Sequence, residues 1–172
     1  VTVAGGRAFI GNIEVVEDGI RKNYNDMMMY SPVGKMDIFP YSTVRGHGNI
    51  MNVTTGDGDE IITLESINNK ILQFKKDTMY VIDISSGEPA TFFVESKNLF
   101  KGVESKEHIF VTEEGVFWFN KNGAFLYNEE EIENVMTREA DGEDIAVNRI
   151  DKNLWSNFIN ADSVCNYNQK SK

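Results

Sequence analysis

The chain has little cysteine and histidine, and it lacks the motifs that usually carry metal or hydrolase chemistry. Its 172 residues include one cysteine, Cys165, and two histidines, His47 and His108, far apart in the sequence. A single cysteine excludes an internal disulfide. No HExxH, CxxC or Gly-x-Ser-x-Gly motif is present, so zinc and triad chemistry lack their usual support. We interpret the histidines as surface or core residues and Cys165 as an inert thiol in a polar tail.

A long apolar run and an excess of basic residues are also missing. No stretch approaches the ~20 consecutive apolar residues that span a bilayer. The 17 Lys and Arg residues stand against 27 Asp and Glu residues, a net charge of −10. This balance argues against a general nucleic-acid binder and against docking to an anionic membrane. Residues 1–12 lack the layout of a secretion signal and begin like the middle of a strand. We therefore expect a processed product or a fragment of a longer protein.

Residues 108–128 (HIFVTEEGVFWFNKNGAFLYN) contain the clearest structural signal. They read as three short strands joined by two turns, and the Asn122-Gly123 step predicts a type I′ hairpin turn. In residues 116–119 (VFWF) and 124–127 (AFLY), both alternating faces are apolar. A sheet with one solvated face would carry a polar residue at every second position. We therefore predict a meander that is covered on both sides, as in the stacked sheets of a β-propeller.

A second copy of this pattern lies in residues 61–84. Residues 71–74 (ILQF) align with residues 116–119, and Lys76 aligns with Lys121, an offset of 45 residues in both cases. A period of about 40 to 50 residues is typical of four-stranded propeller blades. A looser third copy has short strands at residues 7–10 and 27–30, joined by a longer connection.

These repeats predict a mainly β fold built from antiparallel β-propeller blades over residues 1–127. The blades would form a partial propeller or a fragment of a larger one. A generic β-sandwich is the alternative, because both folds give short strands at similar spacing.

The composition changes after residue 127. We interpret residues 128–147 as an acidic connection, because eight acidic residues there stand against one basic residue, Arg138. A solvated loop or short helix is the favoured structure, and a cation site or a docking surface for a basic partner is the alternative.

The sequence pattern of residues 148–172 predicts a short amphipathic helix and a polar tail. Asn148 and Asp151 resemble a capping box. We expect the helix to extend to residue 160 and to cover a sheet edge or the next blade; docking to a partner is the alternative. The predicted apolar stripe consists of Ile150, Leu154, Trp155, Phe158 and Ile159.

Some shorter segments bear on ligand binding. Asp57, Asp59 and Glu60 lie in a Gly/Asp-rich run that resembles a calcium loop. The full EF-hand pattern is absent, however, and a strand-to-strand loop explains the run without an ion. Gly5-Gly6-Arg7 precedes a strand, so it is not a phosphate loop. Asn52-Val53-Thr54 fits the glycosylation acceptor pattern, which we regard as incidental. Paired carboxylates for glycoside hydrolysis stay open, but no pair stands out.

The order of several motifs resembles the propeller region of structural proteins from tailed bacteriophages. The resemblance covers roughly two-thirds of the chain, about residues 5–127. It rests on residues 6–11 (GRAFIG), residues 29–40 (MYSPVGKMDIFP), the Gly/Asp-rich run at 56–60, and strands at 62–64, 71–75 and 79–82, with residues 115–123 similar to the next blade.

This resemblance implies a component of the virion tail, similar to the tail nozzle of short-tailed phages. Such proteins form rings of identical subunits around a DNA exit channel, beside other tail or portal-adaptor proteins, after synthesis in the bacterial cytoplasm. The family implies no catalytic residue, metal or cofactor, so we expect a non-enzymatic protein that lets DNA pass without binding it specifically. The alternative is a carbohydrate-binding or glycoside-cleaving propeller adhesin, in which Trp118, Tyr30 and Tyr80 would stack on sugars.

Overall fold

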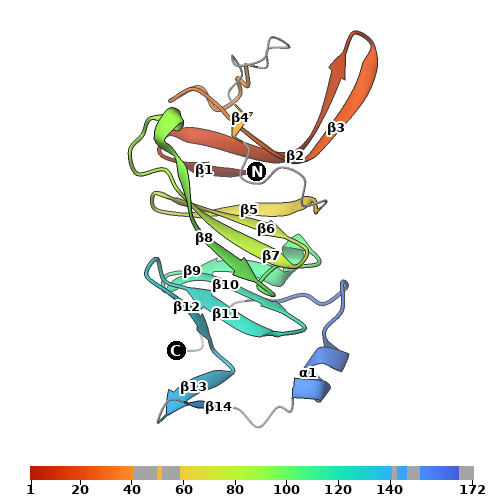
Figure 1. The fold of residues 1–172 in the computed structure, drawn as a ribbon, viewed down its shortest axis with the longest axis vertical. Helices are drawn as coiled ribbons and strands as arrows, with labels where there is room; N and C mark the ends of the chain where they lie inside the picture. Colours follow the sequence, from red (N-terminus) through yellow and green to blue (C-terminus); the bar gives the residue numbers. More distant parts are fainter. Residues whose placement is uncertain (41–49, 52–58, 141–142, 147–151, 167–172) are drawn as a thin grey trace.

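The computed structural model describes residues 1–40, 50–51, 59–140, 143–146 and 152–166, and this part of the chain is mainly β (Figure 1). Most strands belong to three four-stranded antiparallel sheets, and within each sheet the strands follow one another in chain order. The first sheet contains β1 (Thr2–Ala4), β2 (Arg7–Glu17), β3 (Ile20–Tyr30) and β4 (Ile50–Met51). The second contains β5 (Ile61–Ile67), β6 (Lys70–Lys75), β7 (Thr78–Asp83) and β8 (Phe93–Leu99). The third contains β9 (Ile109–Thr112), β10 (Gly115–Asn120), β11 (Gly123–Tyr127) and β12 (Ile132–Asn134).

Smaller elements connect these sheets or follow them. Two 3-10 turns, η1 (Pro89–Thr91) and η2 (Lys106–His108), precede β8 and β9. After the third sheet come a two-stranded hairpin and one short helix: β13 (Thr137–Ala140), β14 (Glu143–Ala146) and α1 (Lys152–Phe158).

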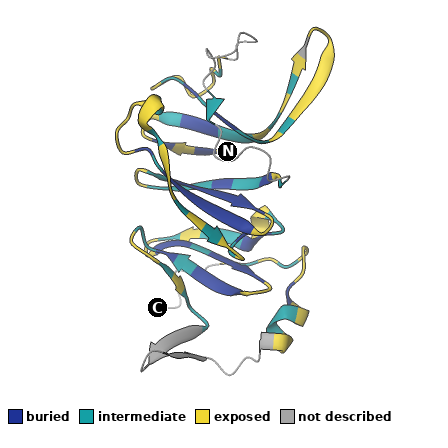
Figure 2. Cartoon of the chain, viewed as in Figure 1, coloured by how far each residue is buried: buried dark blue, intermediate teal, exposed yellow. Residues whose placement is uncertain are grey.

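The three large sheets are stacked one on another along the long axis of the molecule (Figure 1). The second sheet lies in the middle, and the burial of its two inner strands, β6 and β7, is nearly continuous (Figure 2). Aliphatic and aromatic residues such as Phe9, Leu64 and Ile82 fill the space between the first and second sheets. A second apolar cluster, centred on Trp118, fills the space between the second and third sheets. The middle sheet therefore contacts a sheet on each face, which gives three layers rather than the two of a β-sandwich.

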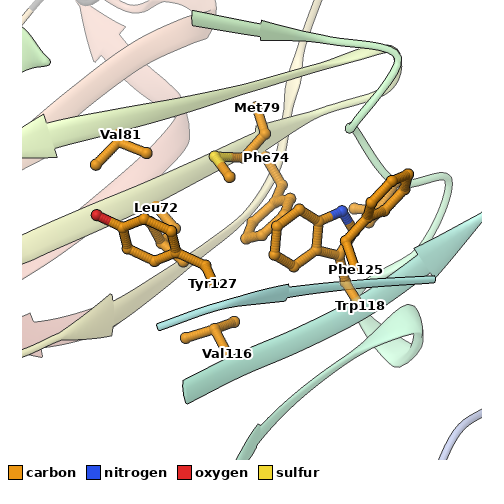
Figure 3. Packing of buried hydrophobic residues seen from close by; sticks show 9 residues of the cluster. Leu72, Phe74, Met79, Val81, Val116, Trp118, Phe125 and Tyr127 are labelled. Atoms are coloured by element: carbon orange, nitrogen blue, oxygen red, sulfur yellow. The ribbon is translucent and has the colours of Figure 1, made fainter. Parts of the chain in front are cut away.

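The prediction that residues 108–128 are covered on both faces is confirmed. On one face, Trp118 packs edge-on against Phe74 of the second sheet, with ring centroids 5.2 Å apart (Figure 3). On the other face, Phe119 packs against Trp155 of α1, with centroids 6.4 Å apart, and beside the buried Ile159. A sheet covers one side, and the C-terminal segment covers the other.

The 45-residue offset relates the second sheet to the third. The two-residue turn Lys76-Asp77 between β6 and β7 corresponds to Lys121-Asn122 between β10 and β11. Phe74 lies on the face of the second sheet that meets the third sheet. Its equivalent, Phe119, lies on the face of the third sheet that meets α1. The sequence repeat thus corresponds to two sheets with the same layout and the same direction of stacking.

The predicted turn type in residues 120–123 is wrong. The turn between β10 and β11 is not the expected type I′ turn at Asn122-Gly123, because its two central residues are Lys121 and Asn122 and neither has a positive φ. The side chain of Asn120 stabilises this turn by accepting a bond from the Asn122 amide (2.7 Å). Positive φ angles at both central residues occur instead at Asp18 (52°) and Gly19 (78°), in the turn between β2 and β3.

The strands expected at residues 7–10 and 27–30 are longer than predicted. They belong to one hairpin, β2–β3, whose strands are 11 residues each. What the sequence indicated as a long connection is therefore the outer part of this hairpin, which projects from the stack (Figure 1).

The acidic connection and the helix also need correction. The loop or short helix expected at residues 128–147 contains β12, β13 and β14. Of these strands, β12 lies at the edge of the third sheet, where the charged side chain of Glu133 is exposed. In α1, Trp155 packs on the third sheet as predicted, but Leu154 and Phe158 are 67% and 75% exposed. The expected apolar stripe is therefore only partly buried, and the predicted cap at Asn148 lies outside the described residues.

Candidate functional site

A cleft of about 310 Å³ lies between the last strands of the second and third sheets. We call it the β8–β12 cleft. Its volume is at the lower end of the range for ligand pockets. Carboxylate, amide and hydroxyl groups line it together with one lysine and one isoleucine: Glu95, Ser96, Asn98, Lys101, Tyr127, Glu130, Glu131 and Ile132.

Side chains of β10 hold the loop that follows β8 and borders this cleft. The indole Nε1 of Trp118 donates a hydrogen bond to the carbonyl oxygen of Lys101 (2.9 Å). The amide Nδ2 of Asn120 donates to the carbonyl oxygens of Phe100 (3.0 Å) and Gly102 (2.7 Å). Both donors are buried side chains of the third sheet, so the loop is fastened to the core by its backbone.

The same loop passes close to the end of β6. The amide of Val103 donates to the carbonyl oxygen of Lys75 (2.9 Å). A Cβ atom at Gly102 would lie 2.3 Å from that oxygen, so only glycine fits there. The loop therefore has little freedom to move relative to the second sheet.

Two residues beside the cleft have a left-handed backbone that their side chains do not favour. Phe100 has φ 62° and Glu129 has φ 81°. The other non-glycine residues with positive φ in the described part of the chain are Asn and Asp, which tolerate this conformation. Residues held in such conformations tend to cluster at functional sites. Both precede residues that line the cleft, Lys101 and Glu130.

The aromatic side chain of Phe100 is not used in the core. It is 67% exposed, and its neighbour Leu99 is 57% exposed. We call these two residues the knob. Their backbone is fixed while their side chains face solvent.

Lys101 is the cation of the cleft. Its Nζ lies 4.2 Å from the centroid of the Phe125 ring, a distance at which the ring face attracts an ammonium group. No carboxylate in the described part of the chain forms an ion pair with it. Partial burial lowers the pKa of this amine.

The opposite wall contains Tyr127, whose hydroxyl donates to the carbonyl oxygen of Glu129 (3.1 Å). Burial raises the pKa of this phenol, and the charge of Glu95 raises it further. Tyr127 therefore acts as a neutral hydrogen-bonding group at neutral pH.

A partly buried ion-pair network positions Glu95 at the cleft. Lys70 Nζ lies 2.8 Å from Asp83 Oδ2 and 2.5 Å from Glu95 Oε2. Burial by itself lowers the pKa of Lys70, but the hydrogen bonds to both carboxylates outweigh it and the net change is upward. The hydrogen bond from Lys70, aided by Ser85, lowers the pKa of Asp83 to about 2.

The aromatic residues considered for sugar stacking lie elsewhere. Trp118 is fully buried, and Tyr80 is 1% exposed, so neither can present a face to a sugar, and the prediction is wrong for both. Tyr30 is half-buried among Phe9 and Phe92, with ring centroids 6.4 and 6.2 Å away. The interpretation of Trp118 as packing between sheets is confirmed.

His108 is a core residue, as interpreted. It is 1% exposed and stacks on Phe119 at 4.6 Å, and its Nε2 lies 3.1 Å from the carbonyl oxygen of Asn160. Cys165 Sγ donates to the carbonyl oxygen of Glu107 (3.3 Å), and burial raises its pKa. These contacts attach residues 160–165 to the third sheet. His47 lies outside the described residues.

The structure describes only part of the predicted calcium loop. Asp59 and Glu60 line a second cleft of about 450 Å³ together with Asn23, Asn25 and Asp26. Asp57 and the Asn52-Val53-Thr54 acceptor lie outside the described residues. Within the described ranges, no three His, Cys, Asp or Glu side chains are arranged to hold a metal ion.

Gly5 and Gly6 form the turn between β1 and β2, with φ angles of 54° and 70°. Arg7 begins β2, as the sequence predicted.

No protein-family model matches the chain, and no curated protein is detectably similar to it. Among the described residues, no helix has the length and apolar character needed to cross a membrane. The site is therefore defined by its geometry alone. Sequence reasoning missed Phe100, Lys101 and Glu129, because a left-handed phenylalanine is set by tertiary contacts. The one local signal is Gly102, a glycine directly after a lysine between two strands.

Proposed function

We propose that the chain is a structural, non-enzymatic component of a bacteriophage tail. It would be one subunit of a nozzle- or tube-like ring around the DNA exit channel. The observation that supports this proposal best is the stack of three successive four-stranded meanders. The order of the sequence motifs, which resembles that in tailed-phage structural proteins, supports the assignment to a phage tail.

In this proposal the three sheets are propeller blades. Each is an antiparallel meander in chain order, and each contacts the next through an apolar face. Propellers typically have four to eight blades. The β13–β14 hairpin follows the third sheet directly and is a candidate for the start of a further blade.

The packing of the stack is consistent with a structural role in the wall of a tube. The spaces between the large sheets are filled by apolar side chains, which makes each unit stiff. The net charge of −10 would let a DNA duplex pass without being gripped, since protein binding to DNA depends on basic groups. Copies of the same chain and neighbouring tail or portal-adaptor proteins would be its partners in the virion.

The test is made on virus particles. An antibody against the chain should label one end of purified particles, and deletion of its gene should leave particles without a complete tail. Supplying the wild-type chain from a plasmid should restore the tail, whereas a Trp118→Ala variant with a disrupted core should not. Particles that assemble a complete tail without the chain would refute the proposal.

A further inference from the structure

The helix α1 and the turn after it cover the outer face of the third sheet. We call residues 152–165, which contain both, the covering segment. Its buried Ile159 packs beside Phe119 and Ala124 of the sheet, and Trp155 packs on the same face. In the second sheet the equivalent face meets another sheet. The covering segment therefore occupies an apolar surface that is suited to packing against a sheet.

Hydrogen bonds to backbone oxygens fasten the covering segment. Trp155 Nε1 donates to a carbonyl oxygen of β10 (2.8 Å). The amide and the thiol of Cys165 donate to the carbonyl oxygen of Glu107 (3.4 and 3.3 Å). In the opposite direction, His108 Nε2 of the third sheet lies 3.1 Å from the carbonyl oxygen of Asn160. A carbonyl oxygen only accepts, so this contact requires the proton of the neutral imidazole to be on Nε2.

The surroundings of His108 accommodate the neutral ring and not the charged one. The ring is 1% exposed and stacks on Phe119, with centroids 4.6 Å apart. A second proton would bind at Nδ1, which is buried and has no hydrogen-bond partner among the described residues. A buried, charged N–H group without an acceptor is strongly unfavourable. The attraction of the Phe119 ring for a cation is weaker than the hydration that the imidazolium would lose.

The charged groups near His108 do not offset this cost. On η2, the side chains of Lys106 and Glu107 are exposed, so water screens both charges. The strands β9 and β10 contain no charged residue. On the covering segment, Asp162 is exposed and the Cys165 thiol is bonded to a backbone oxygen. Within the described part of the chain, no ion pair includes His108.

We propose that His108 makes the docking of the covering segment sensitive to pH. At neutral pH the imidazole is uncharged and the segment lies on the third sheet; in mild acid His108 takes up a proton and the segment is released. A histidine side chain in water takes up a proton at about pH 6.5. Because the released state binds a proton that the docked state does not accommodate, the ratio of released to docked segment should rise by up to about tenfold per pH unit below this value. Release uncovers Phe119 and Ala124. The proposal does not depend on the function proposed above.

Fluorine NMR of the chain labelled with fluorotryptophan tests this proposal, because its two tryptophans lie on opposite faces of the third sheet. Trp155 reports whether the covering segment is docked, and Trp118 reports whether the core between the second and third sheets is intact. From about pH 7.5 to about pH 5, the Trp155 signal should move toward its position in the unfolded chain, while the Trp118 signal stays. Binding of anilinonaphthalene sulfonate, a dye for exposed apolar surface, should increase over the same range.

The variant His108→Gln removes the titrating group and keeps an amide donor for the carbonyl oxygen of Asn160. Its Trp155 signal should be the same at both pH values. His108→Phe retains an aromatic ring against Phe119 and serves as a second variant if the glutamine chain does not fold; its Trp155 signal should not respond to pH either. His47→Gln, at the other histidine of the chain, is the matched control and should respond as the wild type does.

The proposal would be overturned by a wild-type Trp155 signal that does not change with pH, or by a His108→Gln chain that responds as the wild type does. A Trp118 signal that moves together with that of Trp155 would also overturn it, because the third sheet would then be separating as a whole. One measurement needs no variant: in the wild-type chain, the imidazole signals of His108 should titrate with the same midpoint as the Trp155 signal. Different midpoints would refute the coupling.

Discussion

Trp118 lies on β10, and Phe100 lies in the loop that side chains of β10 hold in place. The surroundings of these two aromatic residues are opposite. Trp118 is fully buried between two sheets, and its indole fastens the loop by a hydrogen bond to Lys101. Phe100 lies one residue before Lys101, with a left-handed backbone and an exposed ring. The loop thus joins a residue that stabilises the fold to one that does not. This difference separates a side chain that holds two sheets together from one that faces solvent.

The largest expected effect is on the buried side of this comparison. Trp118→Ala removes the ring that packs on Phe74 and Phe125 and leaves a cavity. We expect a loss of about 3 to 5 kcal/mol in the free energy of unfolding, measured by urea denaturation. Trp155→Ala, at a half-buried ring on the other face of the third sheet, should cost less. Equal losses would contradict the central role of Trp118.

A smaller effect is expected at the loop itself. Asn120→Ala removes the bonds to the carbonyl oxygens of Phe100 and Gly102 and leaves the buried Gly102 oxygen without its donor. The expected cost is about 1 to 3 kcal/mol. Amide hydrogen exchange in the loop should also become faster. Asn122→Ala, which removes one exposed bond to the same loop, should have a much weaker effect; if both substitutions behave alike, the buried amide is not what fastens the loop.

At the exposed residue, Phe100, we expect a substitution to increase the stability of the fold. Phe100→Gly relieves the left-handed backbone, whose cost for an L-residue is about 1 to 2 kcal/mol. Because glycine also loses more entropy on folding, we expect a net stabilisation of about 1 kcal/mol or less. In thermal unfolding, Phe100→Gly should raise the melting temperature, whereas Trp118→Ala should lower it. A destabilised Phe100→Gly chain would mean that the ring contributes to the core.

An effect of similar size, which depends on pH, concerns the ion pair that positions Glu95. Because Lys70 lowers the pKa of Asp83 from 3.8 to about 2, the pair stabilises the folded state at neutral pH. That contribution is present above the ordinary pKa and is lost as the pH falls through about 2. Stability should therefore decrease by on the order of 1 kcal/mol over this range. In Asp83→Asn this part of the pH dependence should disappear; an identical slope in both chains would exclude Asp83 as its source.

The sequence predicted the parts of this fold that depend on periodic patterns. Two-faced apolar strands such as residues 116–119 required cover on both sides, and the 45-residue repeat matched two sheets of the same layout. The failures concern features set by tertiary contacts. The β10–β11 turn departs from type I′ because Asn120 bonds both to the turn and to the distant loop. The candidate site escaped prediction because a φ of 62° at Phe100 has no local sequence signature.

The position of α1 has a consequence for the outer face of the third sheet. In the second sheet, the face that carries Phe74 meets another sheet; in the third sheet, the equivalent face that carries Phe119 meets α1 and Ile159 instead. A helical segment therefore takes the place on this face that a sheet takes on the other, and it shields the apolar side chains there from water, as the capping segments of repeat proteins do.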